Sequence, residues 1–365
     1  MSDLKKDNAY LIQLDGLRFF AILSVMIAHW LQWQTEKPLY KAFPFVEGVT
    51  LFFVLSGYLI TDILLRNKVR YEELQHSKLP LIKAFYIRRV LRIFPVYFIT
   101  LLFLVCISYK NIKEVFPWLA TFTSNIYMPL KHTYMGNFNH FWSLAVEEQF
   151  YLFWPWLLIF IPTKHTGKLI VLIIGLSVLS KFLFVKYTGN WMASSYHTIC
   201  CMHALGLGAL FAYWNIFRKD TIAFFLKPYW IIVSMLLYFT IHYLASLKNW
   251  ELEKNSTDSF LYALMAVMLV NYAAQNKFKG VFKCILENRF VVYSGKISYG
   301  LYIFHLFIPD FFKEFLCPKM GIEIHNKYVL FIIYYVITFI IAHVSWKLIE
   351  NPINNLKKHF PYSFG

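Results

Sequence analysis

The sequence predicts an all-α protein that crosses a membrane many times. Of its 365 residues, 58% are hydrophobic, 20% are aromatic and only 15% are charged, whereas soluble domains carry about 25% charged residues. Apolar stretches long enough to cross a bilayer recur along nearly the whole chain. Lysines and arginines gather in the short segments between these stretches, as they do in the cytoplasmic loops of membrane proteins.

Ten apolar stretches are predicted to span the membrane. They cover approximately residues 12–33, 46–65, 93–110, 143–163, 168–187, 198–217, 228–247, 259–276, 297–316 and 328–349. A further apolar stretch, 115–130, is broken by Pro117, Ser124, Asn125 and Pro129, which favours a re-entrant or interfacial segment over an eleventh span. The polar stretches are too short to fold alone, so residues 1–365 are expected to form one transmembrane domain.

The distribution of positive charge predicts the orientation. Residues 66–92 contain eight lysines and arginines, 277–296 contain five, and Lys357 and Lys358 lie near the C-terminus. These segments are expected in the cytoplasm together with both termini, and an even number of spans agrees with that. Because the net charge of +16 lies in short loops rather than on one soluble face, it indicates contact with anionic lipid headgroups or a polyanionic cofactor and not nucleic acid.

The five cysteines are scattered and form no CxxC pair, so neither a disulfide framework nor a metal site is expected. The first apolar stretch is interrupted by Arg18 and His29, which makes a cleaved signal peptide an unsuitable interpretation. These two residues are eleven positions apart, so they fall on nearly the same helix face, about 16 Å apart along the axis. Ionisable groups inside a membrane usually face a cavity and mark function.

Two further segments carry candidate functional residues, one at the middle of a span and one at the cytoplasmic entrance of the next. The segment 48–61 contains Ser56 and a mid-span Gly57, which permits close approach of either another helix or a ligand. The segment 85–98 contains Arg88, Arg89 and Arg92 within about one helical turn. Guanidinium groups bind phosphate oxygens in pairs, so this cluster favours a phosphate-binding role over a simple membrane anchor.

Polar side chains also recur in three later segments. In 139–155, Ser143, Glu147 and Tyr151 follow one another at four-residue spacing and share a helix face. A carboxylate there would orient a histidine or protonate a leaving group, and a structural ion pair with a buried arginine is the alternative. The other candidates are Tyr302 and His305 in 296–309, and Glu350 beside Pro352 at the end of the last span.

Six blocks of this chain, taken together and in order, resemble the membrane-bound acyltransferase-3 family, which includes O-acetylases of lipopolysaccharide O-antigen, peptidoglycan and exopolysaccharide. The resemblance covers nearly the full length and rests on LDGLRFFAILSVMIAHW (14–30), FFVLSGYLIT (52–61), FYIRRVLRIFPVY (85–97), HFWSLAVEEQFYLFWP (140–155), ISYGLYIFH (297–305) and IENP (349–352).

The resemblance implies a protein of the bacterial cytoplasmic membrane that transfers an acyl group, usually acetyl, from cytoplasmic acetyl-CoA to a hydroxyl of an extracytoplasmic or lipid-linked carbohydrate. It implies His29 as the catalytic histidine and Arg89 and Arg92 as an R-x-x-R element. Glu147 and Glu350 match the family's acidic positions. The extracytoplasmic SGNH-type domain of some relatives is not expected in this chain, so either this domain completes the transfer or a separate partner enzyme does.

On this interpretation the arginines would hold the CoA phosphates, and Arg18 would also contact the donor. His29 would either deprotonate the acceptor hydroxyl or carry the acetyl group itself, with Glu147 orienting it. Ser56, Tyr151 or His305 would help to stabilise the developing oxyanion, and Tyr302 is a further supporting residue. The outward loops 34–45, 111–142, 188–197, 248–258 and 317–327 would select the acceptor. Other acyl donors or acceptors, and a transporter using the same polar path, are the alternatives.

Overall fold

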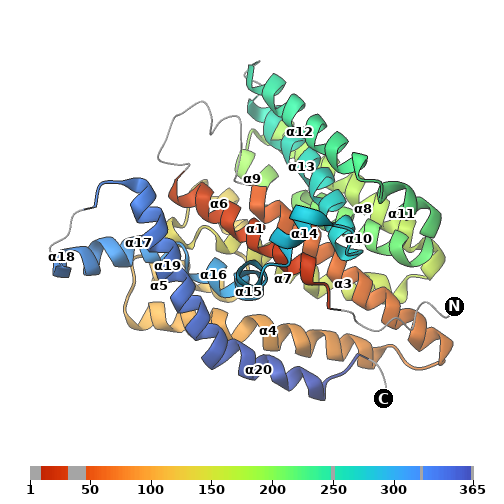
Figure 1. Cartoon of the computed structure of the whole chain (residues 1–365), viewed down its shortest axis with the longest axis horizontal. Coiled ribbons are helices and arrows are strands. Elements are labelled where there is room, and N and C mark those ends of the chain that lie inside the picture. The colour runs from red at the N-terminus through yellow and green to blue at the C-terminus, as the bar shows by residue number, and fades with distance from the viewer. Residues whose placement is uncertain (1–9, 32–46, 248–250, 321–323, 363–365) are drawn as a thin grey trace.

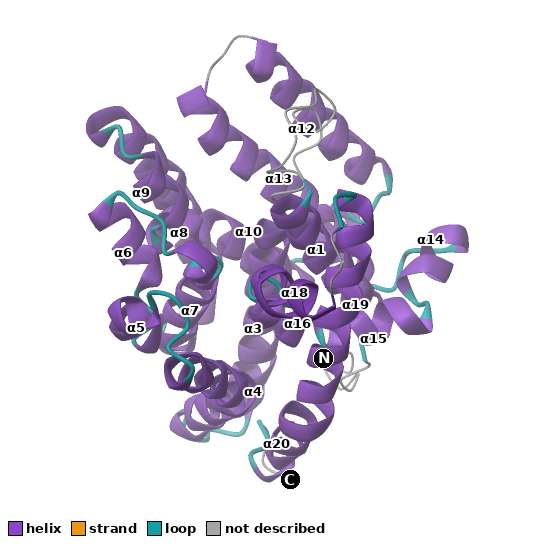
Figure 2. Cartoon of the chain, turned by 90° about the vertical axis from the view of Figure 1, so that its left-hand side faces the viewer, coloured by secondary structure: helices purple, strands orange, loops and turns teal. Residues whose placement is uncertain are grey.

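The computed structural model describes residues 10–31, 47–247, 251–320 and 324–362, and every regular element in these ranges is helical (Figure 2). The α-helices are α1 (Ile12–Trp30), α3 (Gly48–Glu73), α4 (Leu79–Cys106), α5 (Ile112–Ala120), α6 (Ser124–Lys131), α7 (Phe141–Phe160), α8 (Thr163–Leu183), α9 (Trp191–Tyr196), α10 (Thr198–Phe217), α11 (Lys219–Phe225), α12 (Tyr229–Leu247), α13 (Glu251–Ala274), α14 (Gly280–Leu286), α15 (Arg289–Lys296), α16 (Ser298–Phe304), α17 (Ile308–Phe311), α18 (Cys317–Met320), α19 (Lys327–Ser345) and α20 (Asn351–Asn355).

Within the described ranges, seven helices are long and apolar enough to cross a membrane, and there are eight candidate spans if α11 and α12, bent by 61°, count as one. These helices identify a multi-pass membrane protein. The predicted number of ten spans is not confirmed. Helix α7 does not reach the same hydropathy, because Glu147, Glu148 and Gln149 follow one another in its middle.

The predicted span 297–316 is not a continuous helix. Helix α16 ends at Phe304, α17 begins at Ile308 with Pro309 in its first turn, and a π-helical turn covers Phe312–Leu316. Proline lacks the N–H group that would continue the α-helical hydrogen bonds, and it is well suited to start a new helix. The break leaves His305 between two helices rather than on the regular face of one.

The apolar stretch 115–130 forms parts of two short helices, α5 and α6, rather than one span. The side chain of Gln149 on α7 connects to this segment, since its amide donates to the carbonyl of Phe122 at 2.8 Å and to Asn125 Oδ1 at 3.0 Å. Its placement as a re-entrant segment stays a prediction.

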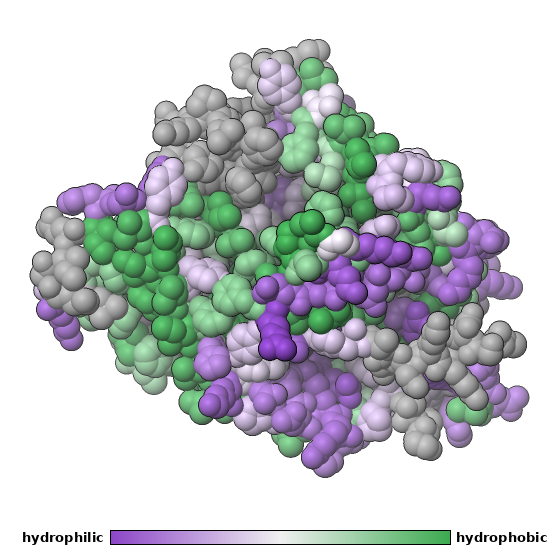
Figure 3. Space-filling view, viewed as in Figure 1, coloured by the Kyte–Doolittle hydropathy of each residue, from purple (hydrophilic) through white to green (hydrophobic). Residues whose placement is uncertain are grey.

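Figure 1 shows the ends of the long helices on two opposite sides of the molecule. The turn between α3 and α4 lies at the right and α20 at the lower edge, whereas α5, α17 and α18 lie on the left. On the face shown in Figure 3, most hydrophilic residues gather at the right and lower edge. The turn between α3 and α4, with the lysines and arginines near it, therefore lies at one end of the molecule. The assignment of that end to the cytoplasm stays a prediction.

Helices α3 and α10 contact each other through their backbones at two glycines. A Cβ atom on Gly57 would lie 1.9 Å from the carbonyl oxygen of Leu205, and one on Gly208 would lie 2.1 Å from that of Val54. No side chain fits at such distances, so both positions require glycine. Of the two roles considered for Gly57, the structure assigns helix packing, and the close contact fixes the neighbouring Ser56.

Candidate active site

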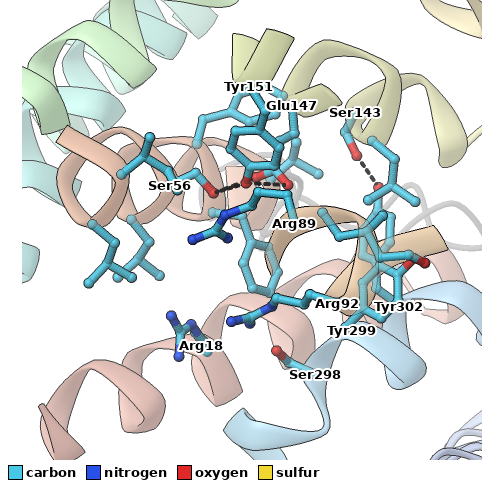
Figure 4. A pocket seen from close by; sticks show the side chains of 18 of the residues that line it. Arg18, Ser56, Arg89, Arg92, Ser143, Glu147, Tyr151, Ser298, Tyr299 and Tyr302 are labelled. Atoms are coloured by element: carbon cyan, nitrogen blue, oxygen red, sulfur yellow. Dashed lines mark hydrogen bonds between the residues drawn. The ribbon is translucent and has the colours of Figure 1, made fainter. Parts of the chain in front are cut away.

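A cavity of about 250 Å³ lies among α1, α3, α4, α7 and α16. We call it the arginine cavity, because three arginines line it. Figure 4 shows their guanidinium groups directed toward a common space, with Arg89 beside Glu147 and Tyr151 and with Arg18 and Arg92 across from these two residues. The predicted site residues that line it are Arg18, Ser56, Arg89, Arg92, Glu147, Tyr151 and Tyr302.

The three arginines differ in their partners. Arg18 forms an ion pair with Asp15 of its own helix. Arg89 lies against the rings of Phe85 and Tyr151, 5.5 Å and 5.4 Å from their centroids, and its buried Nε has no hydrogen-bond partner. Arg92 likewise has no hydrogen bond or ion pair with any described residue. Two guanidinium groups without protein anions provide a site for a ligand that carries several negative charges.

Glu147 belongs to a hydrogen-bonded group with Ser56 and Tyr151 (Figure 4). Ser56 Oγ donates to Glu147 Oε1 at 2.7 Å, and the Tyr151 hydroxyl lies 3.1 Å from Ser56 Oγ and 3.3 Å from Glu147 Oε2. The shared face predicted for Glu147 and Tyr151 is therefore present. The expected contact of Glu147 with His29 is absent, because Glu147 accepts its hydrogen bonds from Ser56 and Tyr151.

A second cavity, of about 260 Å³, contains His29, and we call it the histidine cavity. Its polar wall includes Glu47, Asn139, His140, Lys181 and Ser259. Aromatic side chains form another wall, made by Tyr134, Trp142, Trp191 and Tyr196. Two of the loops predicted to select the acceptor, 111–142 and 188–197, supply part of this lining, whereas the loop 34–45 lies outside the described residues.

His29 contacts a second histidine, His305, which lies at the break in the predicted ninth span. His29 Nδ1 lies 2.9 Å from His305 Nε2, and the two rings stack with their centroids 5.0 Å apart. His305 Nδ1 lies 2.7 Å from the carbonyl oxygen of Tyr302. A third ring, that of His140, is edge-on to His305 at 5.0 Å.

These contacts determine the tautomers of the two neutral imidazoles. Because a carbonyl oxygen only accepts, His305 Nδ1 must carry the hydrogen, and its Nε2 must accept. His29 then donates from Nδ1, so its Nε2 is the nitrogen with the basic lone pair. His305 is thus a positioning residue for His29, and it has no N–H left for the oxyanion role that was expected of it.

The two cavities meet at Val49 and Tyr302, which line both. The Tyr302 hydroxyl is held at the junction by contacts of 2.6 Å with Ser143 Oγ and 2.7 Å with the carbonyl oxygen of His140. Helix α1 passes along both cavities, with Arg18 in the first and His29 in the second. The helix face predicted to carry both Arg18 and His29 therefore lines both the arginine cavity and the histidine cavity.

Two predicted site residues lie away from the cavities. Arg88 donates to the carbonyls of Lys357 at 2.8 Å and Phe360 at 3.1 Å, so it attaches the C-terminal segment to α4 rather than lining the arginine cavity. Glu350 is buried and accepts a hydrogen bond from Ser345 at 3.2 Å. Sequence reasoning missed Glu47, His140 and Lys181. Of these, only His140 had a usable signal, because it opens the block 140–155.

Comparisons with known proteins agree with this arrangement. A family model described as an acyltransferase domain matches residues 11–347. The chain is 28% identical to the Staphylococcus aureus (strain COL) protein named "Putative O-acetyltransferase SACOL0978", over 95% of this chain and 58% of that protein. It is 27% identical to "O-acetyltransferase OatA" of Staphylococcus aureus (strain NCTC 8325), over 96% of this chain and 58% of that protein. The chain thus spans about 58% of the length of these relatives. No solved structure matches it significantly.

Proposed function

Because the chain belongs to the acyltransferase-3 family, we propose that it is an O-acetyltransferase. It would use acetyl-CoA as the donor and a carbohydrate hydroxyl as the acceptor. The observation that carries this proposal is the pair of adjoining cavities, one lined by arginines and the other containing His29. The arginine cavity receives the donor from the cytoplasm, and the histidine cavity receives the acceptor from the opposite side of the bacterial cytoplasmic membrane.

The donor side depends on charge. Arg89 and Arg92 have no protein anion as partner, and Arg18 stands beside them. They would bind phosphate oxygens of CoA through paired hydrogen bonds, while the acetyl-pantetheine arm extends between Val49 and Tyr302. Glu147 would hold the hydroxyls of Ser56 and Tyr151 beside this arm. Each hydroxyl has a single hydrogen, so one of them would have to turn from its present partner to donate to the thioester oxygen as that oxygen gains charge.

On the acceptor side, His29 Nε2 would take the proton of the sugar hydroxyl while the hydroxyl oxygen attacks the thioester carbon. The C–S bond then breaks, and the imidazolium returns the proton to the leaving CoA sulfur. The products are the acetyl ester and CoA with a free thiol. Attack by His29 Nε2 itself, followed by transfer from the imidazole, uses the same nitrogen and remains the alternative route.

Replacing Val49 with phenylalanine tests whether the two cavities form one active site. The larger side chain narrows the junction, so acetyl transfer is expected to fall about tenfold or more, a rise of at least about 1.4 kcal/mol in the barrier. The phosphates of acetyl-CoA should still bind in the arginine cavity. Overpacking of this kind also costs about 1–3 kcal/mol of folding stability. The measurements are acceptor-dependent CoA release and equilibrium binding of labelled acetyl-CoA by the purified protein.

Val49→Ala is the matched control, because it widens the same junction and should keep transfer. A thermal melt of each variant separates a blocked junction from a loss of folding. Wild-type transfer by a well-folded Val49→Phe variant would contradict a path between the two cavities.

A further inference from the structure

Lys181 is a buried cation in the wall of the histidine cavity. It lies on the face of α8 that also buries Thr166, Ile170 and Ser177, and the residue is only 6% exposed. None of the described residues offers its ammonium group a hydrogen-bond acceptor, and no described carboxylate lies within 4.0 Å of it. The helix carries no carboxylate, so this lysine has no ion-pair partner on α8.

Two carboxylates lie near this wall, and neither forms an ion pair with Lys181. Glu47 lines the same cavity, and its Oε2 accepts a hydrogen bond at 2.6 Å from Thr50, a neutral hydroxyl that leaves the carboxylate charge in place. Asp258 is paired with His242 at 2.7 Å. A buried charge without a partner is unfavourable unless an ion or a polar ligand compensates it. Among the described residues, the cavity therefore presents a cation, Lys181, and a carboxylate, Glu47, that do not pair directly with each other, together with His29.

The other lining residues suit a sugar ring. The ring centroids of Trp142 and Tyr196 lie 4.8 Å apart, and those of Trp191 and Tyr196 lie 6.0 Å apart. Such aromatic faces stack against the apolar face of a pyranose, while the Glu47 carboxylate can accept a hydrogen bond from a hydroxyl group. A saccharide bound there would have its ring against the aromatic wall and its polar groups toward Glu47, Lys181 and His29.

We infer that the acceptor is an acidic saccharide, whose carboxylate or phosphate pairs with Lys181 while one of its hydroxyls meets His29. This inference rests on the proposed function, because it takes the histidine cavity as the acceptor site. It adds a class of substrate and a residue that selects it. The cation would distinguish acidic from neutral sugars and would hold the ring in one orientation above His29.

The test compares three small acceptors that share a pyranose ring: methyl glucoside, methyl glucuronide and glucose 6-phosphate. In the wild-type protein, kcat/KM for acetylation is expected to be about tenfold higher for an acidic sugar than for methyl glucoside, as one charged hydrogen bond provides. In Lys181→Gln this preference should disappear, through a higher KM for the acidic sugar. Lys181→Arg should restore much of the preference.

Lys186→Gln is the matched control. Lys186 follows on the same segment, but it is exposed and its ammonium lies over the rings of Phe182 and Tyr187, away from the cavity. Its removal should leave the preference unchanged. The comparison of methyl glucuronide with glucose 6-phosphate shows whether the anion is a carboxylate or a phosphate.

Binding provides a readout that does not depend on turnover, since Trp142 and Trp191 line the cavity and report through their fluorescence. If an acidic sugar quenches the fluorescence of the wild type but not of Lys181→Gln, the inference is supported even when no product forms. The absence of product would count only against the proposed acetyl transfer. Equal use or binding of acidic and neutral sugars, or a preference that survives Lys181→Gln, would overturn the inference while leaving acetyl transfer intact.

Discussion

Replacement of His29 by alanine is expected to lower acetyl transfer about 10²–10⁴-fold, the contribution of a positioned general base. The variant loses the Nε2 lone pair that the contacts with His305 and Tyr302 make basic. Acetyl-CoA binding should stay within about twofold of the wild type, because His29 lines the histidine cavity and the arginines line the other. The measurement is CoA release with a saccharide acceptor, together with binding of labelled acetyl-CoA.

The matched control is His165→Ala, since His165 is exposed at the start of α8 and lines neither cavity. A His29→Ala protein that keeps transfer within tenfold of the wild type would remove His29 from the mechanism. A variant that fails to bind acetyl-CoA would instead place the donor across both cavities.

Replacement of Arg92 by alanine is expected to weaken acetyl-CoA binding about 10- to 100-fold, because hydrogen bonds to charged groups each contribute about 1.5–3 kcal/mol. Arg92 lines the arginine cavity without a protein anion as partner, so a donor phosphate is the group that would lose its contact. Arg92→Lys should recover part of the affinity, since it keeps the charge but not the planar pair of donors.

Acetyl-pantetheine, which lacks the phosphates of CoA, separates charge from packing. Its affinity should be nearly the same in the wild type and in Arg92→Ala. Arg289→Ala is the control, because Arg289 is exposed and lies outside the cavity. An equal loss of affinity for acetyl-pantetheine and acetyl-CoA would show that Arg92 supports the shape of the cavity rather than binding phosphate.

The residues that sequence alone could place are those whose helix periodicity defines a face. The eleven-residue spacing of Arg18 and His29 predicted one inward stripe, and both residues line cavities. The four-residue spacing of Glu147 and Tyr151 likewise predicted a contact that is present. Periodicity within one helix is a local property, so it survives without knowledge of the tertiary structure.

The contacts between distant segments could not be predicted in the same way. His29 and His305 are 276 positions apart, and their contact depends on how α1 and α16 pack, which neither local sequence specifies. Lys181 lies near the end of an apolar stretch, where a lysine usually serves as an interfacial anchor. Arg88 is adjacent to Arg89 but about 100° away around the helix, and that rotation directs it to the C-terminal segment.

The structure does not confirm the predicted number of spans, for a related reason. Apolar composition indicates which segments avoid water, but it does not distinguish a helix that crosses the bilayer from one that is broken or that carries polar groups at the site. The stretch 297–316 is broken into short helices, and α7 contains Glu147 and Glu148. Both segments build the cavities, so the exceptions to the hydropathy pattern lie at the functional site.

The central claim is that one chain passes an acetyl group between two compartments on opposite sides of a membrane. The most direct measurement uses proteoliposomes with one protein orientation, labelled acetyl-CoA outside and a panel of bacterial saccharides inside. With the arginine cavity open to the outside, labelled acetyl ester is predicted in the lumen and CoA outside, and Val49→Phe should produce about tenfold less of both. Intact acetyl-CoA in the lumen without any acetyl ester would contradict the account and indicate a transporter.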